Sequence, residues 1–441
     1  MLRPIYQRAA HFAVALALAE RAALAQTPGP SAAPAPGGLT LMDVLRSAVE
    51  RHPLVDAARA RVGAARGARM TAGTLPNPIL SYQVENVGFP GRTTPVASVR
   101  ETQTFATLPL EPLWQRSPRV HRANEDVLAS EARLTLARRE VAIDAARAFF
   151  RLALAQVNAA AAAEAREGLD SLVRYTTARV NEGATAEGDL IRLQVERDRA
   201  ATAAVTRQVE LVRAQSVLAP YLSDSVRVGA LPRAIVAVDD AVVLARRSLP
   251  PAETFAARVL TARPDVVAAR AQARGAAAEL TLQHTLLVRQ LGATFGAKST
   301  GGTYSMMAGL SAPLPMFDQN RGEVQRADGE RSAAERELAW TERLATAEVA
   351  GAYEAARLFT TQVAALDGQL LTRAAQARGI AVAAYQEGAG SLLQVIDATR
   401  TLADARATYY EALFARAESL LALYAAAGFD PADAMTIGGT R

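Results

Sequence analysis

The sequence predicts an α+β fold in which a unit of long helices and short strands occurs twice. Apolar residues recur at spacings of three and four over long stretches, as in helices packed along one stripe. At four shorter places they alternate with small or polar residues, as in strands with one apolar face. A Glu-Gly pair interrupts each long helical pattern, first at Glu182-Gly183 and again at Glu387-Gly388. We therefore expect two copies of a unit of about 200 residues.

Composition narrows the classes of protein. The chain has 441 residues, half of them hydrophobic, a formal net charge of +5 and no cysteine. Without cysteine there are no disulfides or thiolate sites, and we expect no lipoprotein anchor. Arginine alternates with Asp and Glu along the helical patterns, so the basic charge predicts solvated helix faces rather than a nucleic-acid partner.

Residues 1–25 have the pattern of a secretory signal peptide. An apolar run at Phe12–Ala19 follows two arginines, and Ala23-Leu24-Ala25 is a cleavage pattern. Because Glu20 and Arg21 interrupt the apolar run, an ordinary amphipathic helix is the alternative. Residues 26–38 are rich in Pro, Gly and Ala and predict a linker without a core.

The first unit is expected at residues 39–218. Thr40 is positioned to cap a short amphipathic helix, and Pro53 to begin the next one. The patterns that follow predict, in order, a helix to Ala72, strands at 80–84 and 96–108, a helix of about 60 residues from Pro118, and a returning helix at 189–218. Pro220 is expected to end that helix.

The second unit is expected at residues 251–428, after a connecting segment at 219–250 without a clear period. Arg263-Pro264 corresponds to His52-Pro53 at the start of a helix. The predicted order continues with strands at 291–297 and 304–310 around Gly301-Gly302, a long helix at 321–383, the second Glu-Gly turn, and a helix behind a Ser391 cap. Residues 429–441 form a tail.

The strand patterns favour assembly of several copies. Four strands cannot close on themselves, and open sheet edges are unfavourable in water and prohibitive in lipid. Alternation of apolar and polar residues is typical of an outer-membrane barrel, in which Tyr82 and Tyr304 could belong to an aromatic girdle. The sequence beyond the signal contains no apolar run of 18 residues, so any membrane segment is expected to be a barrel shared by a homo-oligomer.

In these features the chain resembles the TolC-like outer-membrane efflux factors, from about Leu39 to Gly428. The resemblance rests on the repeat, on Leu75-Pro76-Asn77-Pro78 before Val84-Glu85-Asn86, on 312–318 (APLPMFD), and on the two Glu-Gly turns. It is greatest to the branch associated with heavy-metal exporters.

The resemblance implies a homotrimer in the outer membrane. Four strands from each of three copies would make a twelve-stranded barrel, continued by a barrel of long helices across the periplasm. Such a duct is passive, touches outer-membrane lipid, and receives substrate from an inner-membrane pump, often proton-driven, through a periplasmic adaptor. Heavy-metal cations are the substrate that the branch suggests.

The resemblance also implies roles for residues at the turns. Glu182, Gly183, Glu387, Gly388 and Ser391 would form the tip that docks the adaptor. Counting from the two glycines places a pore constriction at Asp189, Gln394 and Asp397.

Gln394 departs from the pair of acids typical of the family, which leaves the strength of a cation-binding ring open. The alternative for Asp189 and Asp397 is that they are exposed acids favoured by helix dipoles. For Glu182 and Glu387 the equal alternative to adaptor contact is that they are solvated turn residues.

No catalytic or cofactor-binding pattern is found, and we do not expect an enzyme. His52, His121 and His284 are scattered and have no cysteine or histidine partner for a metal site. The alternative to an export duct is a periplasmic helical scaffold or adaptor-like coiled coil. Strand pairs that face lipid distinguish the two, since a soluble scaffold does not need them.

Overall fold

A computed structural model describes residues 38–87, 99–110, 113–222, 234–287, 291–367 and 369–431. The predicted signal peptide, residues 26–37 of the linker and residues 432–441 of the tail lie outside these ranges. So do parts of the connecting segment and of the predicted strand at 96–108. Everything below concerns the unit that begins at Leu39.

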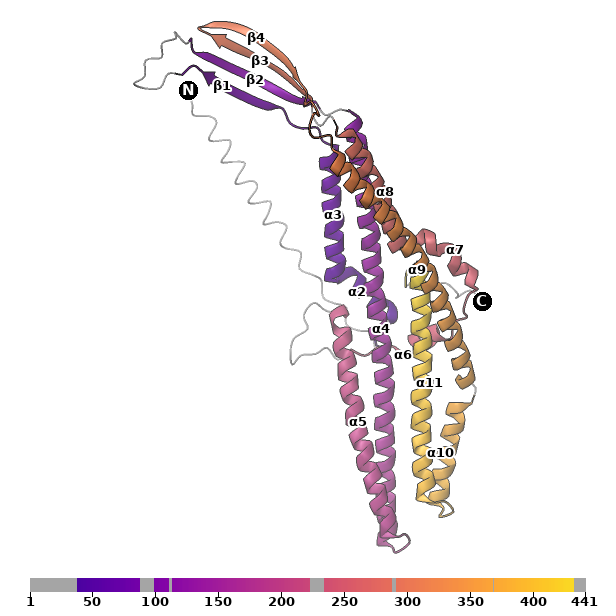
Figure 1. Cartoon of the computed structure of the whole chain (residues 1–441). Coiled ribbons are helices and arrows are strands. Elements are labelled where there is room, and N and C mark those ends of the chain that lie inside the picture. Colours follow the sequence, from indigo (N-terminus) through magenta and orange to yellow (C-terminus); the bar gives the residue numbers. More distant parts are fainter. Residues whose placement is uncertain are drawn as a thin grey trace. The chain divides into compact units, whose positions relative to one another are not determined.

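Four antiparallel strands form one sheet (Figure 1). They are β1 (Ile79–Glu85), β2 (Glu101–Leu110), β3 (Leu291–Thr300) and β4 (Thr303–Ser311). The two predicted hairpins are therefore present, and β2 pairs with β3 to join them. Gly301 and Gly302 turn the second hairpin with φ of +57° and +88°, a region that glycine adopts without strain. β1 and β4 are the two edges of the sheet.

The register puts apolar side chains on one face of this sheet. Leu80 is opposite Ala106, which is opposite Phe295, which in turn is opposite Ala308. Met306 and Leu310 belong to the same face and are 96% and 85% exposed. The other face carries polar residues, including an ion pair of 2.5 Å between Lys298 and Glu101. The predicted alternation thus gives one apolar and one polar face.

Ten helices are described besides the sheet. They are α2 (Leu41–Arg51), α3 (Pro53–Gly73), α4 (Leu113–Asn181), α5 (Glu187–Leu222), α6 (Val238–Ala245), α7 (Ala252–Ala262), α8 (Pro264–Thr285), α9 (Arg321–Asp367), α10 (Leu370–Gln386) and α11 (Leu392–Ala426). α4 and α5 form one long hairpin, and α10 and α11 form another; both turn at the end remote from the sheet (Figure 1).

Several predicted boundaries are confirmed by local bonds. Thr40 caps α2 in a capping box with Asp43, Pro53 occupies the first turn of α3, and Ser391 caps α11. Backbone N–H groups at a helix N-terminus have no partner within the helix. The side chains of Thr40 and Ser391 accept hydrogen bonds from such groups, and Pro53 has no backbone N–H that needs a partner. These signals are local, which is why the sequence predicts them.

Other boundaries were predicted wrongly. The helix expected at 321–383 is two helices, α9 and α10, and Gly368 in the sequence between them has the lowest helix propensity after proline. α4 begins five residues before Pro118 and contains it. α5 continues two residues past Pro220. The connecting segment contains α6, a helix of 8 residues too short to reveal a period.

The main core lies where the long helices meet the short ones. Phe149 and Leu152 of α4, together with Leu413 of α11, are fully buried there. Phe255 of α7 packs edge-on against Tyr424 and Phe429 at centroid distances of 5.3 Å and 6.0 Å. This core anchors α4 and α11 at the ends of the hairpins opposite their turns. Both helices run unbroken from the core to the turns, which therefore lie far from the sheet.

Candidate functional site

The candidate site is the pair of turns that end the two hairpins. Gly183 and Gly388 have φ of +74° and +76°, which an L-residue with a side chain adopts only with strain. Ala184 N–H donates to the Arg179 carbonyl, and Ala389 N–H donates to the Ala384 carbonyl, both at 2.8–2.9 Å. The two turns therefore close in the same way, by bonds that satisfy the last carbonyls of α4 and α10.

The second turn leads into a capping box. Gln394 N–H donates to Ser391 Oγ at 3.4 Å, and Ser391 N–H donates to Gln394 Oε1 at 3.1 Å. A glutamine is well suited to this reciprocal pair. The structure thus gives Gln394 a local structural role as the partner of the Ser391 cap.

The predicted acids lie on both hairpins. Asp189 is half-buried in the first turn of α5, and Asp397 is exposed in the second turn of α11. Glu182 and Glu387 are exposed beside their glycines, and Glu387 is the C-cap of α10. The pore and docking roles of these residues stay predictions.

The two turns are close together. The Arg179 guanidinium lies 3.9 Å from the position that a Cβ on Gly388 would take, and it lies over the Tyr175 ring. Tyr175 Oη donates to the Gln386 carbonyl at 2.9 Å. The Tyr385 hydroxyl forms a buried bond of 3.1 Å with Thr176 Oγ1. Each hairpin therefore contributes a tyrosine hydroxyl that bonds to the other hairpin.

An apolar cluster lies behind these bonds. Its buried members come from both hairpins and are Leu169, Leu172, Leu193, Tyr385, Leu392 and Val395. It is separate from the main core and contains only six buried residues. A cluster of this size contributes far less burial than the core, so the turns are the less stable end of the helices.

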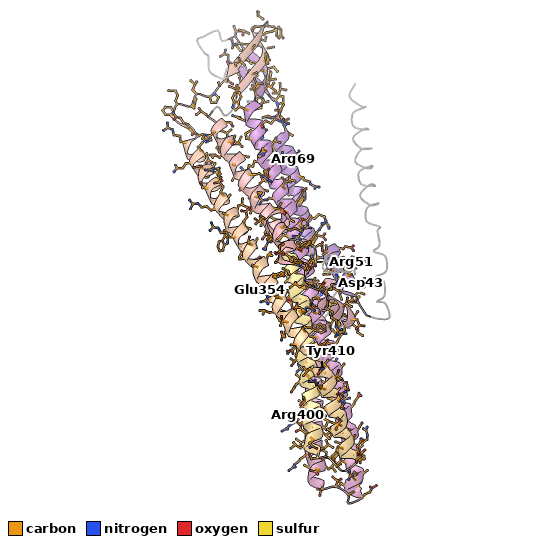
Figure 2. All side chains as sticks on the ribbon, turned by 90° about the vertical axis from the view of Figure 1, so that its right-hand side faces the viewer. Asp43, Arg51, Arg69, Glu354, Arg400 and Tyr410 are labelled. Atoms are coloured by element: carbon orange, nitrogen blue, oxygen red, sulfur yellow. The ribbon has the colours of Figure 1, made fainter. Side chains whose placement is uncertain are left out.

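Ion pairs continue the contact between the hairpins. Arg400 of α11 donates to Glu196 of α5 at 2.6 Å, and Arg406 of α11 donates to Glu164 of α4 at 2.6 Å. Arg400 projects from the lower part of α11 (Figure 2). Each pair joins residues more than 200 positions apart in the chain, so each resists separation of the two hairpins.

Glu196 is the acid of this region whose pKa is shifted. Burial raises its pKa, but hydrogen bonds and charge from Arg400 and Arg199 outweigh burial and hold the pKa below its ordinary value. Glu196 is therefore charged at neutral pH, with a cation on each side.

Sequence analysis did not identify Tyr175, Tyr385, Glu196 or Arg400. The tyrosines gave no shared signal, since Tyr175 precedes Glu182 by seven residues and Tyr385 precedes Glu387 by two. Glu196 and Arg400 gave no such signal, because Arg and acidic residues are frequent along every helix of the chain. Only the packing of the hairpins selects this pair.

The described residues contain no group of three or more His, Asp or Glu side chains placed to hold a metal ion. Among the helices of the described ranges, none is both long enough and apolar enough to cross a membrane.

Part of the chain matches a known protein family. Residues 256–429 match the family described as outer membrane efflux protein. The chain is also 25% identical over 377 residues to the cobalt-zinc-cadmium resistance protein CzcC of Cupriavidus metallidurans, covering 85% of this chain and 86% of that protein.

Solved structures share the fold. The outer membrane channel CmeC of Campylobacter jejuni gives a TM-score of 0.73 at 18% identity over 89% of this chain and 86% of its own. VceC of Vibrio cholerae gives 0.69 at 21% identity, over 88% and 96%. CusC gives 0.72 at 19% identity, over 92% and 99%. At these identities the similarity is one of fold.

Proposed function

On the premise that this chain belongs to the outer membrane efflux proteins, we propose that it is the exit duct of a tripartite export system. Three copies assemble in the outer membrane. Their strands form one barrel of twelve, four from each copy, and their helices form a tunnel through the periplasm. The duct is passive and catalyses no reaction.

The observation that carries the proposal is the sheet. It has an exposed apolar face, a polar face and two unpaired edge strands within the described chain. A barrel of several copies pairs every edge, turns the apolar face to lipid and the polar face to water. Its ten-residue strands are about 33 Å long, and at a tilt of about 40° they span about 25 Å, the height of the apolar band of such barrels.

The partners follow from the same premise. An inner-membrane pump, with the proton gradient as its energy source, delivers substrate through a periplasmic adaptor that docks on the two Glu-Gly turns. Divalent heavy-metal cations are the proposed substrate, because CzcC is named for resistance to cobalt, zinc and cadmium. The cations are cargo, and the duct needs no resident metal to pass them.

We assign the narrowest part of the duct to the level of Asp189, Gln394 and Asp397. All three lie within two turns of the Glu-Gly turns. Around a threefold axis, three copies of Asp397 would place three negative charges at one level and attract cations. Glu182, Gly183, Glu387, Gly388 and Ser391 would then face the adaptor.

Conductance in planar bilayers, with the mass of the purified protein in detergent, tests the proposal. We expect a trimer that opens small, cation-selective channels. A water-soluble monomer or dimer that opens no channel would contradict the duct, and would favour the helical scaffold instead.

The Asp397→Ala variant tests the constriction. Losing three charges at one level should weaken block of the current by divalent and trivalent cations about tenfold, since a single charge at short range is worth about 1–2 kcal/mol. Glu354→Ala, which removes an exposed acid from α9 far from the turns (Figure 2), is the matched control and should leave the block unchanged. If cations block the parent protein, Asp397→Ala and Glu354→Ala equally, Asp397 is not part of the constriction.

A further inference from the structure

The four strands of the sheet contain three charged side chains. They are Glu85 on β1, Glu101 on β2 and Lys298 on β3. The register puts all three on the polar face, where most of the other residues are Ser, Thr, Gln or Gly. The charge of the strands is therefore confined to one face of the sheet.

These charges also lie at one end of the sheet. Glu85 is the last residue of β1, Glu101 is the first residue of β2, and Lys298 is two residues before the end of β3. The helices join the opposite ends of the strands, because α3 leads into β1 and β2 leads into α4. With the helices in the periplasm, the charged end of the sheet is the end at which cargo leaves the duct.

Lys298 compensates one of the two acids. Its Nζ lies 2.5 Å from Glu101 Oε2, and Thr300 Oγ1 donates to Glu101 Oε1 at 3.2 Å. Both carboxylate oxygens of Glu101 are therefore held by β3. Lys298 is the only lysine of the chain, in which every other basic residue is arginine.

Glu85 is the acid that this pair leaves over. It is exposed and lies directly opposite Glu101 in the register. Like charges at opposite positions of antiparallel strands are destabilising, so stability of the sheet does not account for the second acid. Arg100 directly precedes β2 and by the alternation of strands belongs to the other face. Two acids and one cation leave one negative charge per copy at this end of the polar face.

We propose that Glu85, Glu101 and Lys298 form a charge-selective ring at the exit of the duct, the exit ring, whose strength Lys298 sets. Three copies place three net negative charges at one level, which enriches small hydrated cations over anions in the last part of the lumen. The inference rests on the proposed function, because only a closed barrel turns the polar face into the wall of a lumen.

The exit ring is independent of the constriction assigned to Asp397. The two levels lie at opposite ends of the molecule, and α4 alone, with its 69 residues, is about 100 Å long. That length is about ten times the Debye length of about 10 Å in 0.1 M salt. Charges at one level therefore do not act on ions at the other.

Reversal potentials in planar bilayers test the exit ring, because they give the ratio of K⁺ to Cl⁻ permeability. In about 0.1 M KCl, Lys298→Gln should raise this ratio about twofold, since it leaves both acids without a cation. Glu85→Gln should lower the ratio about twofold. In about 1 M KCl, where the Debye length is about 3 Å, both differences should disappear.

Two variants separate the charge from the structure of the sheet. Lys298→Arg keeps the positive charge, and Glu101→Lys combined with Lys298→Glu keeps both the ion pair and the net charge. Both should show the permeability ratio of the parent protein. Equal ratios for Lys298→Gln and Lys298→Arg would contradict the exit ring. Glu85→Gln breaks no ion pair of the sheet, so it reports the charge even if Lys298→Gln does not assemble.

The side of the membrane is a further readout. With about 0.1 M salt on one side and about 1 M on the other, channels of one orientation should show the Lys298→Gln effect in only one direction of the gradient. An equal effect in both directions would place the charges inside the tunnel and contradict an exit ring. If the parent and the variants open channels with the same ratio, the exit ring fails and the duct stands. If the parent opens no channel, the proposed function itself fails.

Discussion

At the scale of single residues, Glu196 connects the chemistry of a side chain to the position of a helix. Its carboxylate is bound by Arg199 within α5 and by Arg400 across to α11. Because the folded pKa is lowered, its contribution to stability is complete at neutral pH and is lost as the pH falls from 4.5, its ordinary value, through the lower folded pKa.

Glu196→Gln should therefore loosen the two hairpins. We expect local opening of α5 and α11 to become easier by about 1 kcal/mol, since Arg400 is itself exposed, which lowers hydrogen-exchange protection near residues 196 and 400 about fivefold. The difference from the parent protein should shrink as the pH falls below 4.5 and through the lower folded pKa of Glu196. Glu210→Gln, which removes an ion pair within α5 alone, is the control. Equal protection in the two variants would show that the contact across the hairpins contributes nothing.

At the scale of elements, the sheet depends on a glycine in β3. A Cβ on Gly296 would lie 2.4 Å from the Thr104 carbonyl oxygen and 2.5 Å from Phe105 Cβ. Phe105 is opposite Gly296 in the register, and its Cβ and Cα occupy the space that a side chain at 296 would need. The pairing of β2 with β3, which joins the two hairpins, therefore requires glycine at this position.

Gly296→Ala should weaken the sheet by about 1–3 kcal/mol, because the strands must separate to admit the methyl group. The measurement is gel electrophoresis of samples heated to a series of temperatures, and its readout is the temperature at which the band of folded protein disappears. Gly309→Ala in β4 is the matched control, since nothing lies within 4 Å of its Cβ position. Should both variants melt alike, the close approach of β2 and β3 would not be a constraint on folding.

The limits of prediction are also clearest at this scale. Strand positions, the glycine turns and the caps at Thr40 and Ser391 could be predicted, because each depends on neighbouring residues. The pairing of β2 with β3 joins residues about 190 positions apart and has no local signal. The contacts of Glu196 and Tyr385 at the turns could not be predicted for the same reason.

At the scale of the whole molecule, the unpaired edges β1 and β4 allow a direct test of assembly. Within one chain they are separated by two strands, a distance of about 14 Å, and a disulfide needs Cα atoms about 4.4–6.8 Å apart. A disulfide from β1 to β4 can therefore form only between copies. The absence of native cysteine makes the experiment unambiguous.

Ser81→Cys in β1 should be combined in turn with Ser305→Cys, Met307→Cys and Gly309→Cys in β4, all on the polar face. We expect one combination to give covalent dimers and trimers on oxidation. Ser81→Cys with Phe105→Cys, which are register partners within one chain, is the control and should give only monomers. Monomers from every combination would contradict a barrel closed between copies.

The break between α9 and α10 has a consequence for the count of partners. One hairpin of each chain rises from the uninterrupted α4, and the other from a helix divided near residue 368. A ring of three chains would therefore present six turns of similar backbone on two alternating kinds of stem. If the adaptor recognises only the turns, six adaptor molecules should bind per ring. If it also contacts the helices that carry the turns, three should bind. Stoichiometry would thus report which part of the hairpin is recognised.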